Sequence, residues 1–326
     1  MTETASATAI VDSAVERPHA LRRQIGRPPG RSPAASRNLA GYAFLAPWLI
    51  GFTVFTAGPL LASLYLSFTN YALIGDFEFV GLANYVRMFT QDPRYINSVL
   101  VTLTYVLVSV PLQLAFALLL AVALNRPLRG IGLYRALYYL PSLLGASVAV
   151  AVMWRQLFGR GGVFNTVVES MTGLEDLPSW VNDPSTALLT LILLRVWQFG
   201  APMVIFLAGL RQIPQELYEA ARVDGASKWR QFISITLPML SPVIFFNVVM
   251  QVIGAFQAFL PAYIVSGGTG GPSDSTMFYT LYIYQVGFNY FDMGYASALA
   301  WVLLLMIAGS TAILFWSSRY WVHYRD

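Results

Sequence analysis

The stretch RQIPQELYEAARVDGASKWRQFISITLP, residues 211–238, decides how this chain is organised. It is polar and charged, yet it lies between two long apolar segments near 186–210 and 239–265. Apolar segments of that length are typical of membrane spans. The stretch between them is therefore predicted to lie at the membrane surface, where it can serve as a docking surface for another protein.

Local signals within this stretch predict two short helices joined by a turn. Pro214 suits the first position of a helix, because the N–H that it lacks would have no partner there, and we expect a helix over 214–222. Gly225 falls where that helix ends, and glycine enters left-handed backbone geometry without steric cost. Ser227 is placed to cap the next helical turn.

The side chains of the first predicted helix suit a close contact with a partner. Ala220 and Ala221 keep one face small, so that another surface can approach, and Glu219 can fix the orientation of the helix through a cation. The alternative is an ordinary loop, in which the alanines and the glycine serve only to form a helix and a turn.

The composition is that of a membrane protein with several spans. Hydrophobic residues make up 56% of the 326 positions and charged residues 11%, whereas soluble domains carry about 25% charged residues. The mean hydropathy is +0.58. Six apolar runs reach the roughly 20 residues that a hydrocarbon core of about 30 Å requires. These runs lie near 41–67, 98–124, 136–158, 186–210, 239–265 and 296–318.

Basic residues set the expected orientation in the membrane. Fifteen of the twenty Lys and Arg residues fall in the N-terminal tail, the 125–135 loop, residues 211–238 and the C-terminal tail. By the positive-inside rule these segments and both termini are cytoplasmic. Residues 1–38 are predicted to be a disordered basic tail, and 39–326 the transmembrane domain. A cleaved signal peptide is the alternative for the first run, but no convincing cleavage site follows it.

Several motifs carry a resemblance to a known family. Glu219-Ala220-Ala221, three residues, Gly225, nine residues and Ile-x-Leu-Pro at 235–238 resemble the EAA loop of ATP-binding-cassette (ABC) importer permeases. The segment FVGLANY at 79–85 resembles a signature of carbohydrate-type permeases, as does YIYQVGFNYFDMGYASALA at 282–300. Over roughly 40–326 the chain resembles the first permease of maltose-type and glycerol-3-phosphate-type importers.

The resemblance implies an all-α membrane protein of the type I ABC importer permease fold, with six transmembrane helices and a cytoplasmic coupling-helix loop. It implies half of a pore for a sugar or sugar-like solute (oligosaccharide, monosaccharide or glycerol-phosphate type), working by alternating access in the bacterial cell membrane. The implied partners are a second permease, a cytoplasmic ABC ATPase dimer that binds ATP and Mg, an extracytoplasmic substrate-binding protein and the lipid bilayer. The residues expected to couple to the ATPase are Glu219, Ala220, Ala221, Asp224, Gly225, Ile235, Leu237 and Pro238.

Polar side chains in the fourth and fifth spans are candidates for the substrate pathway, because polar groups in hydrocarbon need partners. Amides present donors and acceptors, as sugar hydroxyls do, and rings such as Phe259 can cover a pyranose face. The candidates are Arg195, Trp197, Gln198, Asn247, Gln251, Phe256 and Gln257. Hydrogen bonding between helices is the alternative for the amides. For Arg195 the alternative is to extend toward the membrane interface.

Other chemistries lack the residues they need. The chain has no cysteine, and its histidines, His19 and His323, lie in the tails, so no catalytic residue, embedded metal site or cofactor is expected. Lys228, the sole lysine, is in no phosphate-binding loop, so ATP belongs to a partner. No basic run pairs with stacking aromatics, and nucleic acid is not expected. An ion-coupled secondary transporter is the alternative function, although it usually needs midplane carboxylates.

Overall fold

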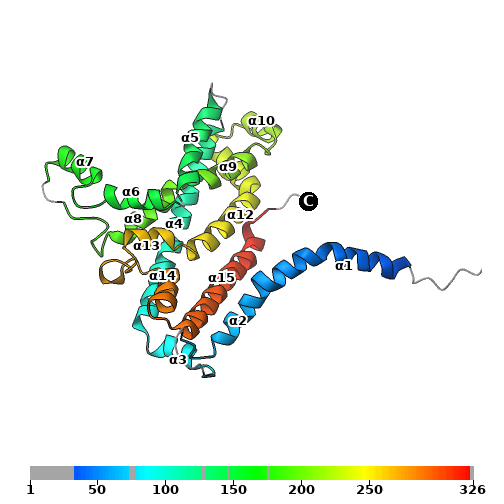
Figure 1. Cartoon of the computed structure of the whole chain (residues 1–326). Helices are drawn as coiled ribbons and strands as arrows, with labels where there is room; N and C mark the ends of the chain where they lie inside the picture. The colour runs from blue at the N-terminus through cyan, green and yellow to red at the C-terminus, as the bar shows by residue number, and fades with distance from the viewer. Residues whose placement is uncertain (1–32, 73–77, 126–129, 146, 175–176, 324–326) are drawn as a thin grey trace, which may run out of the picture. The chain divides into compact units, whose positions relative to one another are not determined.

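The computed structural model describes residues 33–72, 78–125, 130–145, 147–174 and 177–323, and nearly all of its regular structure is helical (Figure 1). Within these ranges the extended pairings are two isolated bridges, Thr69 with Phe79 and Ala72 with Asp292. The predicted all-α fold class is confirmed. The chain divides into two compact units, Met1–Gly58 and Pro59–Asp326.

The first unit holds one long helix in its described part. Helix α1 covers Pro33–Phe52 and continues into the π-helical turn η1 at Thr53–Ala57. Helical residues 33–38 had been expected in the disordered tail. Proline suits a first helical position and the alanines that follow are strong helix formers. Residues 1–32 of the predicted tail lie outside the described residues.

The second unit contains the other helices. They are α2 (Gly58–Leu66), α3 (Ala83–Thr90), α4 (Pro93–Leu124), α5 (Ile131–Leu144), α6 (Val148–Leu157), α7 (Val163–Thr172), α8 (Ala187–Trp197), α9 (Gly200–Leu210), α10 (Gln215–Val223), α11 (Lys228–Gln231), α12 (Leu237–Phe256), α13 (Leu260–Val265), α14 (Tyr279–Tyr284) and α15 (Met293–Trp321), with shorter turns η2 (Phe232–Thr236), η3 (Pro272–Asp274) and η4 (Gln285–Asn289).

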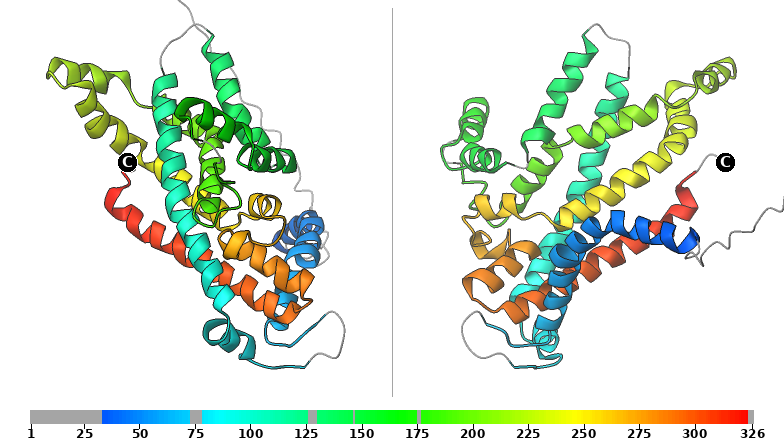
Figure 2. Two further views of the ribbon diagram at one scale, coloured as in Figure 1. Left: turned by 90° about the vertical axis from the view of Figure 1, so that its left-hand side faces the viewer. Right: turned by 45° about the vertical axis from the view of Figure 1, so that its right-hand side comes forward.

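Helix α4 is the centre of this unit. It packs against α8, α9, α12 and α14, and Figure 2 shows it in cyan, running the length of the unit past α12 in yellow. Val106, Val110, Leu114, Ala117 and Ala121 are all buried on it. They recur every three or four residues, the spacing of one helical face. The other helices are therefore arranged around one apolar stripe.

Length and composition qualify four helical stretches as membrane spans, Phe44–Leu66, Pro93–Leu124, Lys228–Val265 and Met293–Trp321. Two bent pairs raise the number to six if each is counted as one span. One pair, α5 with α6, occupies the predicted third run and is bent by 94°, and the other, α8 with α9, occupies the fourth and is bent by 41°. The apolar runs are thus helical, but two of them are broken.

The fifth helical stretch begins at Lys228, well before the expected boundary at 239, because α11, η2 and α12 follow one another without a break. The π-helical turn η2 precedes Pro238. A proline ring collides with the carbonyl four residues earlier and offers no N–H to it. A widened turn relieves that conflict, so the helix continues through the proline instead of starting after it.

Asp92 joins three helices at the end of the unit that carries α3. Its Oδ1 accepts a hydrogen bond from the Tyr95 amide at 3.0 Å and so caps α4. Its Oδ2 accepts hydrogen bonds from the hydroxyls of Tyr282, on α14, and Tyr295, on α15. Burial raises the pKa of Asp92, but the hydrogen bonds outweigh burial and hold that pKa below its ordinary value.

Two ion pairs surround this carboxylate. Arg87 Nη1 lies 2.8 Å from Asp292 Oδ2, and its guanidinium stacks over the Tyr295 ring at 4.2 Å. Arg94 binds Asp274 with two parallel hydrogen bonds of 2.9 Å. Bidentate pairs fix geometry as well as charge. Together with Asp92, these pairs tie α3, the start of α4, η3 and the start of α15 into one block.

Asp92→Ala is expected to lower the free energy of unfolding by about 2–4 kcal/mol, since it removes a helix cap and the charged acceptor of two hydroxyls. Thermal unfolding of the detergent-solubilised chain measures this. Asp92→Asn keeps the cap and an acceptor oxygen, so its loss should be smaller. If Asp92→Ala unfolds no earlier than an Asp183→Ala control, Asp92 does not join these helices.

The lowered pKa also predicts a pH dependence. A carboxyl with a lowered folded pKa contributes its stability above its ordinary pKa of 3.8 and loses it as the pH falls through the folded value. The difference in stability between wild type and Asp92→Ala should therefore be constant above about pH 5 and shrink below pH 3.8.

Candidate functional site

Helix α10 ends in a hydrogen-bonded turn at Gly225. The Gly225 amide donates to the Arg222 carbonyl at 3.1 Å, and the Ala226 amide donates to the Ala221 carbonyl at 2.8 Å. This is the Schellman arrangement, which requires a left-handed residue after the helix. Gly225 has φ +74°, as the sequence predicts. Ser227 caps the next helix by accepting from the Arg230 amide, at 3.3 Å.

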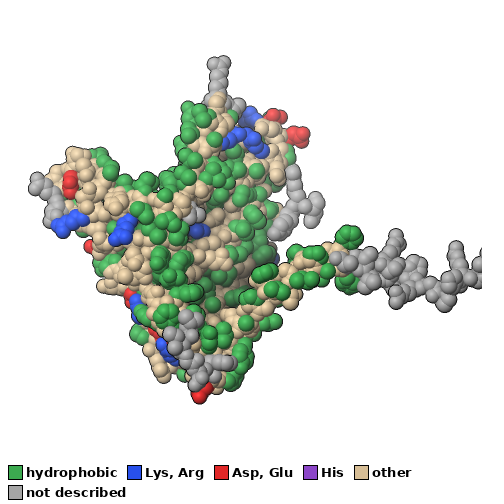
Figure 3. Space-filling model, viewed as in Figure 1, with side chains coloured by type: hydrophobic (Ala, Val, Ile, Leu, Met, Phe, Trp, Pro, Cys, Tyr) green, Lys and Arg blue, Asp and Glu red, His purple; other side chains and the backbone are tan. Residues whose placement is uncertain are grey.

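The surface of α10 is open to a partner. Pro214 lies one residue before the helix, as its cap, rather than at its first position. Glu219 and Ala220 are exposed and Ala221 is half-buried. Figure 3 shows Arg, Lys, Asp and Glu side chains gathered over this helix, at the end of the unit opposite α3. The polar segment therefore projects from the bundle.

The residues expected to couple to the ATPase occupy different places: the turn, a hollow beside it and the start of α12. A hollow of about 290 Å³ is lined by Ala221, Asp224, Ala226, Arg230, Gln231, Ser234 and Ile235. Leu237 and Pro238 begin α12 and do not line it. The Tyr218 and Thr236 hydroxyls lie 2.9 Å apart and tie α10 to η2. A side-chain contact thus connects α10 to the helix that continues into the bundle.

A second arrangement of polar groups forms at the break between α8 and α9. Pro202 has no N–H to donate to the carbonyl of Gln198, four residues earlier. That carbonyl instead accepts from Gln113 Nε2 and Ser142 Oγ, both at 2.9 Å. Ser142 Oγ also accepts from the Ala201 amide at 2.9 Å. Side chains of α4 and α5 therefore satisfy the freed backbone of the broken helix.

Two glycines make room for this break. Gln198 Nε2 donates to the Gly145 carbonyl at 3.0 Å, and a Cβ on Gly145 would overlap the Gln198 side chain. A Cβ on Gly200 would lie 2.7 Å from the Tyr138 carbonyl oxygen. Close approach of α5 to the break therefore depends on both positions having no side chain.

A pocket of about 310 Å³ opens beside the break. It brings together three of the predicted pathway residues, Arg195, Gln198 and Gln257. The side chain of Gln257 is exposed, and Arg195 and Gln198 are half-buried. The pocket is completed by Tyr105, Gly145, Leu194, Ala258, Phe259, Leu260 and Pro261. Amides, a cation and aromatic rings thus share one concave surface, which suits a polyhydroxylated ligand.

The other pathway candidates do not line this pocket. Asn247 is fully buried, and its Nδ2 donates to Val243 in its own helix, at 3.1 Å. Phe256 is 2% exposed and packs in the core. Trp197 faces Trp154, with ring centroids 6.1 Å apart. Gln251 accepts from Arg195. These positions follow from the rotation of each helix, which polar composition does not determine.

The structure adds residues that the sequence did not single out. Tyr105, on α4, and Gly145, at the end of α5, line the pocket. Phe259 stacks on Tyr263 at 5.3 Å, and Tyr284 contacts both rings. The sequence could have indicated Tyr105, because a tyrosine within an apolar run needs a hydrogen-bond partner for its hydroxyl. Gly145 carried no such signal, since its role depends on Gln198.

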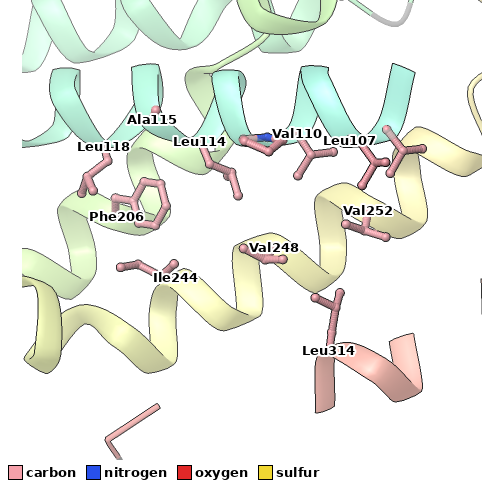
Figure 4. A pocket seen from close by; sticks show the side chains of 12 residues that line it. Leu107, Val110, Leu114, Ala115, Leu118, Phe206, Ile244, Val248, Val252 and Leu314 are labelled. Carbon is pink, nitrogen blue, oxygen red and sulfur yellow. The ribbon is translucent and has the colours of Figure 1, made fainter. Parts of the chain in front are cut away.

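A separate groove of about 380 Å³ lies between α4, α9, α12 and α15. Figure 4 shows that its labelled side chains, such as Leu114, Phe206 and Val248, are hydrocarbon. It offers no side-chain hydrogen bond to a sugar, so it is not a carbohydrate site. In the described part of the chain, no group of three His, Cys, Asp or Glu residues is placed to hold a metal.

Comparisons with known proteins show what the chain is similar to. A family model described as binding-protein-dependent transport system inner membrane component matches residues 86–322. The probable ABC transporter permease protein YesP of Bacillus subtilis (strain 168) is 55% identical over 289 residues, 89% of this chain and 93% of that protein. The lactose transport system permease protein LacF of Rhizobium radiobacter is 34% identical, over 86% of this chain and 95% of that protein.

A solved structure shares the fold. It is a bacterial alginate ABC transporter in complex with an alginate pentasaccharide-bound periplasmic protein, which matches with a TM-score of 0.75 at 22% sequence identity. The match covers 88% of this chain and 96% of that chain.

Gly145→Ala is expected to destabilise the chain by about 1–3 kcal/mol, because the new methyl group forces Gln198 out of position. Thermal unfolding in detergent measures the loss. Gly132→Ala is the matched control, since no atom lies within 4 Å of its added Cβ. Combining Gly145→Ala with Gln198→Ala should recover part of the stability. Equal unfolding of the two glycine variants would contradict the predicted overlap.

Proposed function

Because this chain belongs to the family of binding-protein-dependent transport system inner membrane components, we propose that it forms half of the pore of an ABC importer for a sugar or sugar-like solute. The resemblance noted in its sequence motifs is confirmed by the family match, and the permease fold by the structural match. It is a multi-pass membrane protein. The ion-coupled alternative finds no support among these relatives.

The observation that carries the carbohydrate proposal is the pocket beside the break at Gln198. Its amides can donate to and accept from hydroxyls, and Phe259 offers a ring for the apolar face of a sugar. A relative named for lactose transport supports the same class of substrate. The partner permease would close the open side, since one chain supplies half of such a pore. Arg195, Gln198 and Gln257 are the proposed contacts.

Residues 211–238 are the proposed ATPase-docking surface. Glu219 and Ala220 are exposed on α10, and the hollow beside Asp224 and Ile235 is a receptacle for a partner side chain. ATP and Mg would be bound by the cytoplasmic ATPase dimer. Closure of that dimer would move α10 and, through the Tyr218–Thr236 contact, the long helix from Lys228 to Val265. The pocket would then face each side of the membrane in turn.

The proposed orientation follows from the basic segments. Both termini and α10 would be cytoplasmic. The end of the second unit that carries Asp92 and α3 would face outward. Figure 1 is consistent with this assignment, because α10 and α3 lie at opposite ends of the second unit. The outer end would meet the substrate-binding protein, a partner class supported by the complex of the alginate transporter with its periplasmic protein.

Co-purification tests the docking surface. The tagged chain, co-expressed with a second permease and an ATPase, should retain the ATPase, and Glu219→Lys should reduce its recovery about tenfold, which corresponds to about 1.4 kcal/mol. Gly225→Asp should have a similar effect, because the φ of +74° strains a residue that has a side chain, and the added carboxylate would stand in the open space next to the docking helix.

Gly173→Asp is the matched control for the glycine variant. Gly173 has φ +69° and no atom within 4 Å of an added Cβ, and it ends α7 rather than α10. It should keep the ATPase. If Gly225→Asp and Gly173→Asp both lose the ATPase, backbone strain and not docking explains the result. ATP-independent uptake driven by an ion gradient would overturn the importer proposal itself.

A further inference from the structure

Arg195 is held by hydrogen bonds to a neighbouring helix of the bundle. It lies on α8, within a helix pair predicted to span the membrane. Its Nη2 donates to the Gln251 carbonyl and to Gln251 Oε1, both at 2.9 Å. The Tyr105 hydroxyl also interacts with it. The guanidinium is therefore fixed between α8, α4 and α12, at the wall of the 310 Å³ pocket.

The partners of Arg195 satisfy hydrogen bonds but not charge. Gln251 and Tyr105 are neutral, and the two ion pairs among the described residues, Arg87–Asp292 and Arg94–Asp274, lie elsewhere. None of the candidate spans in the described chain contains Asp or Glu. The Nε atom of Arg195 is buried without a partner. A positive charge within a span is costly and pairs with an opposite charge or with backbone carbonyls. Arg195 has the Gln251 carbonyl but no carboxylate among these partners.

The pocket gives a ligand access to this charge. No acidic residue lines it, and Gln257 is exposed beside Arg195. The remaining lining offers amide groups and the Phe259 ring, which suit hydroxyls and the face of a sugar. An arginine at the wall of such a pocket binds carboxylate and phosphate groups strongly.

We propose that the pocket selects an acidic carbohydrate, with Arg195 as the counter-charge of its anionic group. A uronic acid residue has the required chemistry, because it combines a carboxylate with ring hydroxyls. This inference rests on the proposed function, since it names the class of sugar that the permease admits. It also gives the charge of Arg195 a role, since a neutral hydrogen-bond donor would satisfy Gln251.

The test is ATP-dependent uptake by the complete transporter in proteoliposomes, with its binding protein outside. The probes are digalacturonate, its dimethyl ester, which has the same skeleton without charge, and a hexose phosphate. Wild type should take up an acidic probe at least tenfold faster than the ester. The ratio of the two acidic probes distinguishes a carboxylate from a phosphate as the preferred group.

Two substitutions separate charge from structure. Arg195→Gln should reduce uptake of the acidic probe at least tenfold, whereas Arg195→Lys should keep part of it. Gln257→Glu adds a negative charge on an exposed side chain without removing the Arg195–Gln251 contact, so it should slow the acidic probe several-fold more than it slows the ester. Gln257→Met removes the amide without adding charge, so it should slow the acidic probe and the ester to the same extent. Co-purification with the ATPase confirms that each variant assembles.

The outcomes are distinct. Equal uptake of acid and ester by wild type, or uptake of neutral sugars alone, overturns the proposal that the substrate is acidic. It does not contradict the proposal that the chain is part of an ABC importer. Equal loss of both probes in Arg195→Gln, with no selective effect of Gln257→Glu, assigns Arg195 a purely structural part and overturns the inference. Uptake that needs no ATP overturns the proposed function as well.

Discussion

The carbonyl of Gln198 cannot be satisfied within its own helix, because Pro202 has no N–H to offer. In a membrane span such a group must find another partner, since the surrounding hydrocarbon provides none. Gln113 and Ser142 supply hydrogen bonds from α4 and α5. They can do so only because Gly145 and Gly200 let the helices approach. One missing donor therefore fixes the relative placement of three helices, and the pocket opens where the broken helix bends away.

The same broken helix concentrates the polar chemistry of the bundle. Arg195 lies one turn before the break and Gln198 at it, and both line the pocket, together with Gln257 at the end of α12. The groove between α4, α9, α12 and α15 is built of hydrocarbon instead. Irregular backbone in a membrane protein is tolerated where it lines a cavity or is buried in protein. Polar side chains therefore lie at the irregular backbone of the break, whereas the groove between regular helices is lined by apolar side chains.

Helix α4 connects the two ends at which this unit carries charge. It has 32 residues and so extends about 48 Å. Asp92 caps its first turn and holds α14 and α15 through two tyrosine hydroxyls. Its middle packs on α8, α9 and α12, the helices that form the break and flank residues 211–238. These contacts join the helices into connected blocks, as the proposed alternating access would require.

The sequence alone was sufficient where the signal is local. Apolar runs predicted the helices, and Glu219 to Pro238 predicted the family and the turn at Gly225, because left-handed geometry and helix caps depend on neighbouring residues. Tertiary structure decided which polar residues meet. Asn247 and Gln251 lie one turn apart on α12. Asn247 is buried and donates a hydrogen bond within its own helix, whereas Gln251 accepts one from Arg195 on α8. Gly145 matters only through Gln198, 53 residues away. Such contacts depend on helix rotation and on breaks between distant segments, which no local pattern specifies.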